Sequence, residues 1–442
     1  MKYAPARATC MQALLAAVLT IACAGTPAAD EGFRGYSLEE ATRFRNDWTI
    51  DNWDDGGALM RYVFLNMPEF FNHSLIHRGG SVRELPVKLR TEVAAGVTDT
   101  REGRLPLAAY VRKANVNGVI VLHRGAVVFE SYPRMRPHDT HLLMSVSKVL
   151  ASTLIALLED RGLIDTKRTV DSYLPELGRA GWQGVPVIDI LDMASGIGCL
   201  ELEEGAYENP ERCYYQYEAS LGWQRATAAT VASTHDFIAG LPSHRPSGKV
   251  YEYTSPDTFV LSWLAEQVTG RTYAELLSQE IWQKMGAESD ALISTSRQGA
   301  PVVHGGVSTT LRDLARLGLL FTPSGRKGTD PVVSDVYLQK IQHQGRAEIF
   351  RAAPDSKLSR LNGEAPLYNT YQWDFVMADG DFYKGGYGGQ GLYVSPSRDL
   401  VVAYFGTFDQ GAEDNNQMAS VARQLARSGL FKPVPPAART IR

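Results

Sequence analysis

Ser145 and Lys148 are residues whose types and spacing suit nucleophilic catalysis. The apolar run VLASTLIALLED around and after them predicts a helix from about Ser145, and residues three apart share one face of a helix. Apolar neighbours would desolvate the lysine, lower its pKa and let it accept the serine proton. At a helix start, the backbone N–H of Ser145 would point toward a developing oxyanion. The pair therefore indicates acyl transfer.

Spacing alone does not identify this pair, because Ser324 and Lys327 repeat it. The second pair lies in a stretch rich in Pro, Gly and charged residues, which predicts a solvated loop and no helix. We therefore expect the first pair to be the catalytic one.

A tyrosine that precedes another predicted helix is the second candidate. Tyr253 and Ser255 lead into the run FVLSWLAEQVTG. A phenol beside a desolvated lysine shares one proton with it, so Tyr253 and Lys148 together would relay the proton of Ser145. Tyr207 stands in a similar Tyr-x-Asn arrangement, and it is either a second functional tyrosine or an ordinary half-buried aromatic.

A glycine-rich stretch follows Lys384 and leads into the predicted strand GLYVSP. Glycine weakens a strand, so its repeated use here indicates that a ligand approaches the backbone closely. A bulged or flexible hairpin is the alternative interpretation.

The elements that must position these residues form three blocks. Residues 117–132 read as two strands joined by a His-Arg-Gly turn, whereas residues 391–396 and 399–406 read as neighbouring antiparallel strands. Residues from 165 to about 300 show mostly helical and loop patterns. This order predicts an α/β (α+β) fold, with an antiparallel sheet flanked by helices and an all-helical lobe. We expect the active site between the two parts.

Composition limits the function classes. The 442 residues are 44% hydrophobic and carry a formal net charge of -4, with both signs interspersed. The sequence shows no basic stripe for nucleic acid and no polybasic segment for a membrane surface. We expect small-molecule amide, ester or short peptide substrates. Residues 30–95 contain no recognisable catalytic motif and are expected to wrap the main domain.

The N-terminus is typical of a secretory signal. Lys2 and Arg7 precede an apolar run over residues 11–24, which is too short to span a bilayer and is followed by small residues. We predict a signal peptide over residues 1–29, no membrane span in the mature chain, and a periplasmic or secreted protein. A short buried helix is the alternative, and the residues before Cys23 fit a lipidation site poorly.

Removal of the signal would leave Cys199 and Cys213 as the cysteines of the mature chain. An even pair in an oxidising compartment predicts a disulfide, with two separate buried thiols as the alternative. A bridge across so short a loop would stabilise the fold by roughly 3 kcal/mol.

Taken in order, the motifs Ser-x-x-Lys, Tyr-x-Ser and Lys-Gly-Gly resemble those of serine β-lactamases, penicillin-binding proteins and related esterases. Within that superfamily, the chain is similar to 6-aminohexanoate-dimer hydrolases and family VIII carboxylesterases. The resemblance rests on stretches such as MSVSKVLASTLIALLEDRGLID, YEYTSPDTFVLSWLAEQVTG and GGQGLYVSPSRDLVV. It implies a serine hydrolase domain over residues 96–430, followed by a C-terminal tail at 431–442.

The resemblance also implies roles for individual residues. Ser145, Lys148 and Tyr253 would be the catalytic groups, and the backbone N–H groups of Ser145 and Tyr387 would form the oxyanion hole. The residues implied to contact substrate are Tyr207, Ser255, His304, Trp373 and Lys384.

Two departures from the superfamily pattern concern polar substrate contacts. Ser255 stands where β-lactamases and penicillin-binding proteins have Asn, and Gly385 stands where they have Thr or Ser. Each lost hydrogen bond would cost roughly 0.5–1.5 kcal/mol, which argues against efficient β-lactam turnover. Lys384 would keep the cation that pairs with a substrate carboxylate.

Several alternatives remain open. Within enzymes these are a carboxylesterase, a β-lactamase and a D-alanyl peptide hydrolase. From another class comes a penicillin-sensor-like binding module that is acylated without turnover.

Other chemistries lack a motif. The sequence contains neither a Gly-x-Ser-x-Gly elbow nor a His-Glu-x-x-His zinc helix. His73 and His77 have helical spacing, but no third ligand is evident, so surface or packing roles are expected. No metal and no cofactor is predicted.

Overall fold

The computed structural model describes residues 32–327, 331–354, 360–409 and 416–433. The predicted signal peptide, Cys23 and most of the predicted C-terminal tail lie outside these residues. No helix within the described residues is long and apolar enough to cross a membrane.

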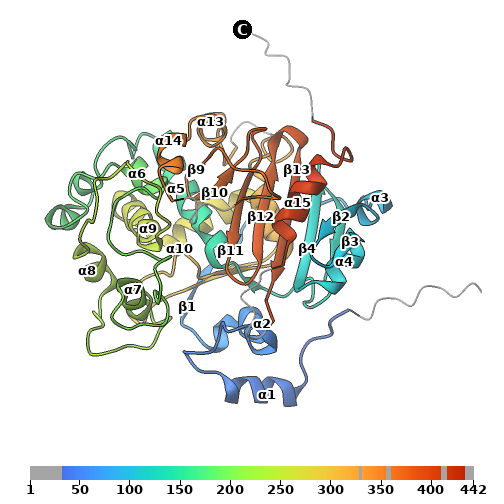
Figure 1. The fold of residues 1–442 in the computed structure, drawn as a ribbon, viewed down its shortest axis with the longest axis horizontal. Helices are drawn as coiled ribbons and strands as arrows, with labels where there is room; N and C mark the ends of the chain where they lie inside the picture. Colours follow the sequence, from blue (N-terminus) through green and yellow to red (C-terminus); the bar gives the residue numbers. More distant parts are fainter. Residues whose placement is uncertain (1–31, 328–330, 355–359, 410–415, 434–442) are drawn as a thin grey trace, which may run out of the picture. The chain divides into compact units, whose positions relative to one another are not determined.

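The main sheet joins strands from the two ends of the chain. Its order is β5-β4-β13-β12-β11-β10-β9, and every neighbouring pair is antiparallel. Figure 1 shows the late strands, in red and orange, beside the early strand β4, in cyan. The strands of this sheet are β4 (Val116–His123), β5 (Ala126–Ser131), β9 (Tyr368–Thr370), β10 (Trp373–Val376), β11 (Phe382–Gly386), β12 (Gln390–Ser395) and β13 (Leu400–Gly406).

Alternating side chains bury both faces of this sheet. Val119 and Val121 of β4 belong to one apolar cluster, which also contains residues of α15. Ile120 and Leu122 point the other way, into the larger cluster that contains residues of α5 and α12. Helices therefore cover both faces of the sheet. The predicted hairpin and the predicted pairing of the two late strands are both confirmed.

Two smaller sheets complete the strand content. One has the order β1-β7-β8-β6 and the other pairs β2 with β3. Because β1 pairs with β7, the N-terminal segment is tied to the region that was predicted to be mostly helical. The strands are β1 (His73–Ile76), β6 (His141–Leu142), β7 (Ala291–Ser294), β8 (Val307–Thr309), β2 (Val97–Thr100) and β3 (Gly103–Pro106).

Helices flank the main sheet and fill the middle of the chain. In Figure 1, α6 to α9 gather beyond the edge of the sheet that carries β9. The predicted fold class, an antiparallel sheet flanked by helices with a helical region beside it, is confirmed. The helices are α1 (Leu38–Asp47), α2 (Gly57–Leu65), α3 (Thr91–Ala94), α4 (Leu107–Lys113), α5 (Lys148–Asp160), α6 (Val187–Leu191), α7 (Cys213–Leu221), α8 (Thr234–Ala239), α9 (Ser255–Thr269), α10 (Tyr273–Leu276), α11 (Gln283–Met285), α12 (Leu311–Leu319), α13 (Asp335–His343), α14 (Ala347–Arg351) and α15 (Met418–Arg427). The short 3₁₀ helices are η1 (Met67–Glu69), η2 (Met144–Ser147), η3 (Val170–Ser172), η4 (Pro175–Arg179) and η7 (Pro396–Arg398), and η5 (Leu277–Trp282) is a π-helical turn.

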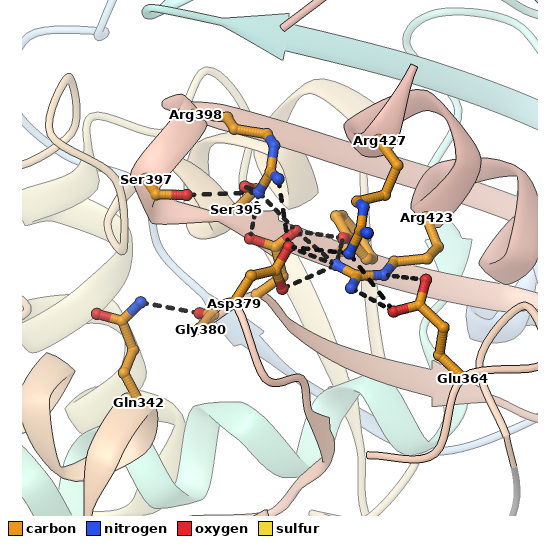
Figure 2. A network of polar contacts seen from close by, with 11 residues as sticks. Gln342, Glu364, Asp379, Gly380, Ser395, Ser397, Arg398, Arg423 and Arg427 are labelled. Atoms are coloured by element: carbon orange, nitrogen blue, oxygen red, sulfur yellow. Dashed lines mark hydrogen bonds and ion pairs between the residues drawn. The ribbon is translucent and has the colours of Figure 1, made fainter. Parts of the chain in front are cut away.

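A buried arginine on α15 links that helix to the strand region through carboxylates. Figure 2 shows the guanidinium of Arg423 within a network of acidic side chains. It donates to Glu364 at 2.6 Å, to Asp379 at 2.9 Å and to Asp381 at 3.0 Å. The side chain of Arg423 is 1% exposed and that of Asp381 is 0% exposed, so each charge depends on its partners for compensation.

Candidate active site

Ser145 lies in the 3₁₀ turn η2, at the entrance to α5. The sequence predicted a helix from Ser145, but the regular α-helix begins only at Lys148. Met144, directly before the serine, has a φ of 47°, a conformation that residues other than glycine rarely adopt. The turn is held against β8, because the N–H of Leu143 donates to the carbonyl of Val307 at 2.7 Å.

The glycine-rich stretch packs against the same turn. A Cβ atom on Gly386 would lie 2.6 Å from the carbonyl oxygen of Leu143 and 3.2 Å from the Cβ atom of Met144. Glycine at this position therefore allows β11 to run directly beside the Ser145 turn. The close approach predicted from the glycines is present, but at Gly386 the approaching group is the chain's own backbone.

Lys148 reaches Ser145 from the first turn of α5. Its Nζ atom lies 3.0 Å from Ser145 Oγ and 3.3 Å from the carbonyl oxygen of His304. The side chain is completely buried, and burial lowers the pKa of Lys148 to about 8, against the opposing effect of the Glu201 carboxylate. About a tenth of such a lysine is neutral at pH 7 and able to accept a proton.

Tyr253 comes just before α9 and lies close to both lysines of the site. The centroid of its ring is 4.9 Å from Lys148 Nζ and 4.7 Å from Lys384 Nζ. Lys384 donates a hydrogen bond of 3.1 Å to the Tyr253 hydroxyl. Burial, and next the negative charge of Asp374, raise the pKa of Tyr253 well above its ordinary value. The phenol therefore keeps its proton at neutral pH.

Lys384, on β11, is paired with an acid on the neighbouring strand. Its Nζ atom lies 2.5 Å from Oδ1 of Asp374 on β10, and Oδ2 of Asp374 accepts the N–H of Gly385 at 2.9 Å. The cation that the sequence suggested for a substrate carboxylate thus already has a partner within the protein.

A disulfide joins Cys199 to Cys213 at the start of α7, as predicted. The loop that it closes carries Glu201, which no sequence motif marked. The hydroxyl of Ser255 donates to one carboxylate oxygen of Glu201 at 2.5 Å, and the hydroxyl of Tyr207 donates to the other at 2.9 Å. Glu201 therefore joins Ser255 and Tyr207, the two residues that the resemblance implied to contact substrate.

Glu201 remains ionised although it is buried. Its residue is 6% exposed, and burial alone would raise its pKa. The charge of Lys148 and the hydrogen bond from Ser255 outweigh burial and hold the pKa of Glu201 below its ordinary value. A negative charge therefore faces the lysine that contacts Ser145.

His304 lies beside this group with its own acidic neighbour. Its Nε2 atom is 2.9 Å from Oε1 of Glu218 on α7, and its Nδ1 atom is 3.1 Å from the hydroxyl of Tyr217. Tyr214 donates to the same oxygen of Glu218 at 2.7 Å. The backbone carbonyl of His304 contacts Lys148, and the residue borders a cavity that also contains Ser145, so it lies near the position that the resemblance implied.

Two cavities share Ser145 and Tyr387 as lining residues. The first, of about 350 Å³, is rich in aromatic side chains, among them Tyr253, and is also bordered by Asp374; we call it the aromatic cavity. The second, of about 650 Å³, is bordered by His304. Because residues of the sheet and of the helical region line the first cavity together, the site lies between the two parts of the fold.

Acidic side chains are the charged groups of the second cavity's described lining. Among the described residues that line it there is no Lys or Arg. Burial, and next the neighbouring Asp55, raise the pKa of Asp54 to about 7. The acidic side chains that line it are Asp51, Asp54, Asp55, Glu201, Glu208 and Glu218, of which Asp51 is paired with Arg225 outside the cavity lining. Three of these lie in the N-terminal segment, in which the sequence showed no catalytic motif.

Trp373 is placed in the core. It is 1% exposed, and its ring packs at centroid distances of 4.6 Å from Phe382 and 5.2 Å from Phe321. It lines neither of the two cavities described above. Alternation along β10 explains the difference, because the next residue, Asp374, points to the cavity face instead.

In the second Ser-x-x-Lys pair, the serine has a structural partner far along the chain from its lysine. Ser324 lies in a turn and Lys327 is exposed, as predicted, but the prediction of solvated surroundings is wrong for Ser324. It is 8% exposed, and its hydroxyl donates to Asp399 at 2.5 Å. This contact with a residue far along the chain was not visible in the local composition.

The two histidines of helical spacing lie on and after a strand. His73 begins β1 and His77 follows it, so their Cα atoms are about 13 Å apart along extended chain. The Nδ1 atom of His77 lies 3.7 Å from Oδ2 of Asp290. The described residues contain no group of three or more His, Cys, Asp or Glu that could hold a metal ion.

The profile of the β-lactamase family matches residues 107–427, which is more than half of the chain. The chain belongs to the β-lactamase family. Among its relatives, the 6-aminohexanoate-dimer hydrolase of Paenarthrobacter ureafaciens is 31% identical over 356 residues, which cover 80% of this chain and 86% of that protein. The family and this relative show that the protein is a hydrolase of the serine hydrolase class. The resemblance seen in the sequence is confirmed.

Solved structures show the same fold. A protein from Bacillus anthracis, provisionally named a 6-aminohexanoate-dimer hydrolase, matches with a TM-score of 0.74 and 22% identity over 87% of this chain and 96% of its own. A family VIII carboxylesterase matches with a TM-score of 0.52 and 16% identity over 72% of this chain and 95% of its own. At these identities the likeness concerns the fold alone.

Proposed function

We propose that this protein is an exported serine hydrolase that cleaves linear amide bonds through an acyl-enzyme on Ser145. The observation that carries the proposal is the contact of 3.0 Å between Ser145 Oγ and the buried Nζ atom of Lys148. A hydroxyl becomes a good nucleophile when a base of suitable pKa removes its proton, and burial lowers the pKa of Lys148 to about 8.

The reaction would proceed in two steps. Ser145 Oγ attacks the carbonyl carbon while its proton passes to Lys148, and the C–N bond then breaks as Lys148 and Tyr253 deliver that proton to the leaving amine. Water then attacks the carbonyl carbon of the resulting ester and passes its proton through the same groups to Ser145 Oγ. The C–Oγ bond breaks, which releases the acid product and restores the serine. Tyr253 suits the relay because its hydroxyl keeps its proton and its ring lies close to both lysines.

The oxyanion would be held by the backbone N–H groups of Ser145 and Tyr387. Both residues border both cavities, and Gly386 keeps β11 against the turn that carries the serine. Donors fixed in this way stabilise the charge that develops on the carbonyl oxygen and supply a large part of the acceleration.

The acidic cavity favours an amide substrate that carries an ammonium group. Its carboxylates would attract a cation and repel an anion, and Ser145 forms part of its wall. The relative that is 31% identical is named for a dimer of an amino acid, which has an amine at one end. A linear amide of the 6-aminohexanoate type would combine this amine with the scissile bond.

Export is part of the proposal because the N-terminal sequence pattern and the disulfide both favour it. The first residues have the pattern of a secretory signal, and the described part of the chain contains a disulfide. Disulfides of this structural type persist in oxidising compartments such as the periplasm.

The experiment compares kcat/KM of the protein with that of Ser145→Ala. The panel contains a linear 6-aminohexanoate amide, a short-chain aryl ester, a chromogenic β-lactam and a D-alanyl-D-alanine peptide. We expect the linear amide to be the best substrate and Ser145→Ala to lose at least about 10⁴-fold in rate, with an unchanged melting temperature.

Each other outcome has a defined meaning. Turnover that survives Ser145→Ala would contradict the assignment of the nucleophile. A faster ester, β-lactam or D-alanyl peptide would replace the amide as the substrate. A mass increase on Ser145 that persists without turnover would identify a binding module of the penicillin-sensor type.

A further inference from the structure

We propose that Asp374 occupies the place of a substrate carboxylate at Lys384, and that this internal partner selects substrates with no carboxylate next to the scissile bond. The inference deepens the proposed function and rests on it. It concerns the aromatic cavity, which Asp374 and Ser145 line together.

Lys384 lies beside a residue that lines the aromatic cavity. Its Nζ atom donates to the hydroxyl of Tyr253 at 3.1 Å, and Tyr253 in turn lies on the cavity wall with Ser145. The side chain of Lys384, however, is 0% exposed, and Lys384 is not among the residues that line the cavity. The ammonium group is therefore near the reacting atoms but screened from the cavity.

Asp374 is the screening group. Strands β10 and β11 pair Phe375 with Tyr383, and one step along this antiparallel register places Asp374 opposite Lys384. One oxygen of Asp374 lies 2.5 Å from Lys384 Nζ, and the other accepts the N–H of Gly385 at 2.9 Å. The side chain of Asp374 is 18% exposed and borders the cavity, so a ligand meets the acid before the lysine.

This arrangement would act against anionic ligands in two ways. A carboxylate that enters the aromatic cavity meets a negative charge instead of the positive charge of Lys384. To pair with the lysine it would also have to displace Asp374 from a buried ion pair, which leaves that acid without compensation. A neutral ligand of the same shape faces neither obstacle.

The test uses equilibrium binding, so that it does not depend on turnover. Affinities of N-benzoylglycine and N-benzoylglycinamide, which have similar shapes but differ in charge, are measured by calorimetry on Ser145→Ala. The same pair is measured on Ser145→Ala combined with Asp374→Asn. We expect Ser145→Ala to bind N-benzoylglycinamide better than N-benzoylglycine. In Ser145→Ala combined with Asp374→Asn, the affinity for N-benzoylglycine relative to that for N-benzoylglycinamide should rise about tenfold.

Two controls separate the ion pair from general effects. Addition of Lys384→Met to the double variant should abolish the gain, because the carboxylate then has no cation to pair with. Asp236→Asn in the Ser145→Ala background removes one exposed negative charge on α8 and should leave the ratio unchanged. Asp374→Ser provides a second replacement if Asp374→Asn lowers the melting temperature.

The proposal would be overturned if the ratio of the two affinities is unchanged in both Asp374 variants. It would also be overturned if the gain in carboxylate affinity persists after Lys384→Met, or if neither ligand binds measurably. The outcome also separates the two proposals. A shifted ratio without any Ser145-dependent turnover would overturn the proposed reaction alone, whereas turnover with an unchanged ratio would overturn the role of Asp374.

Discussion

The Nζ atom of Lys148 lies 3.0 Å from the Oγ atom of Ser145, and the lysine is completely buried. The two residues are one helical turn apart in the chain, yet the serine stands in a 3₁₀ turn and the lysine begins the α-helix. Burial, opposed by Glu201, brings the pKa of Lys148 to about 8. The proposed base therefore changes its protonation state within the range of pH in which activity can be measured.

Activity should rise with pH and level off above about 8. The neutral amine of Lys148 is the proposed base, and its fraction grows as pH increases through the pKa of about 8. The measurement is the pH profile of kcat/KM between pH 6 and pH 10 on the best amide substrate. Lys148→Arg, which stays protonated in this range, should remove the activity at every pH. A profile that is flat between pH 6 and pH 9 would contradict the role of Lys148.

Glu201→Gln should move the rising limb of that profile to lower pH. The carboxylate of Glu201 favours the charged form of Lys148, so its removal lowers the pKa of the lysine further. Glutamine can still accept hydrogen bonds from Ser255 or Tyr207 and keeps the size of the side chain. A matched Glu208→Gln variant removes an exposed acid from the same cavity and should shift the limb less. A shift to higher pH would refute the electrostatic argument.

Replacement of Cys199 and Cys213 by Ala should lower the free energy of unfolding by about 3 kcal/mol. The bridge closes a loop with a sequence separation of 14 residues, and that loop holds Glu201 at the site. Activity should therefore fall before the fold is lost. Denaturant unfolding with and without a reducing agent checks this, since reduction should affect the parent protein and leave the double variant unchanged. Equal stability of the two proteins would contradict the prediction.

Arg423→Met should lower the free energy of unfolding by about 3 kcal/mol, because it removes a fully buried cation from the carboxylates around it. Asp381 would keep the longer contact of 3.2 Å with Arg398. Arg427 on the same helix is the matched control. Its side chain is 53% exposed and its carboxylate partners are 3.6 Å and 3.8 Å away, so Arg427→Met should cost no more than about 1 kcal/mol. Urea unfolding of both variants measures the difference. Similar losses in the two variants would show that burial does not determine how much each arginine of the network in Figure 2 contributes to stability.

Local patterns along the chain were enough to predict the Ser145 and Lys148 contact, the pairing of early and late strands, and the disulfide. Each depends on spacing or alternation that covalent geometry sets over a few residues, or on the count of cysteines in the mature chain. Its place before a predicted helix already marked Tyr253, and the resemblance to a known family added roles for Tyr207 and His304. The structure brings all three to the same site. Trp373 was also implied, and it turned out to pack into the core.

Tertiary structure alone decided the charges around these residues. Glu201 meets Ser255 across 54 positions of the chain, and Lys384 meets Tyr253 across 131, so no local pattern could report either contact. The partner of Lys384 was likewise decided by strand register, because a shift of one residue would turn Asp374 to the opposite face. The residue types and their spacing along the sequence thus indicated which groups can react. Long-range packing determined their pKa values and their partners, because both depend on what lies within a few ångströms in space.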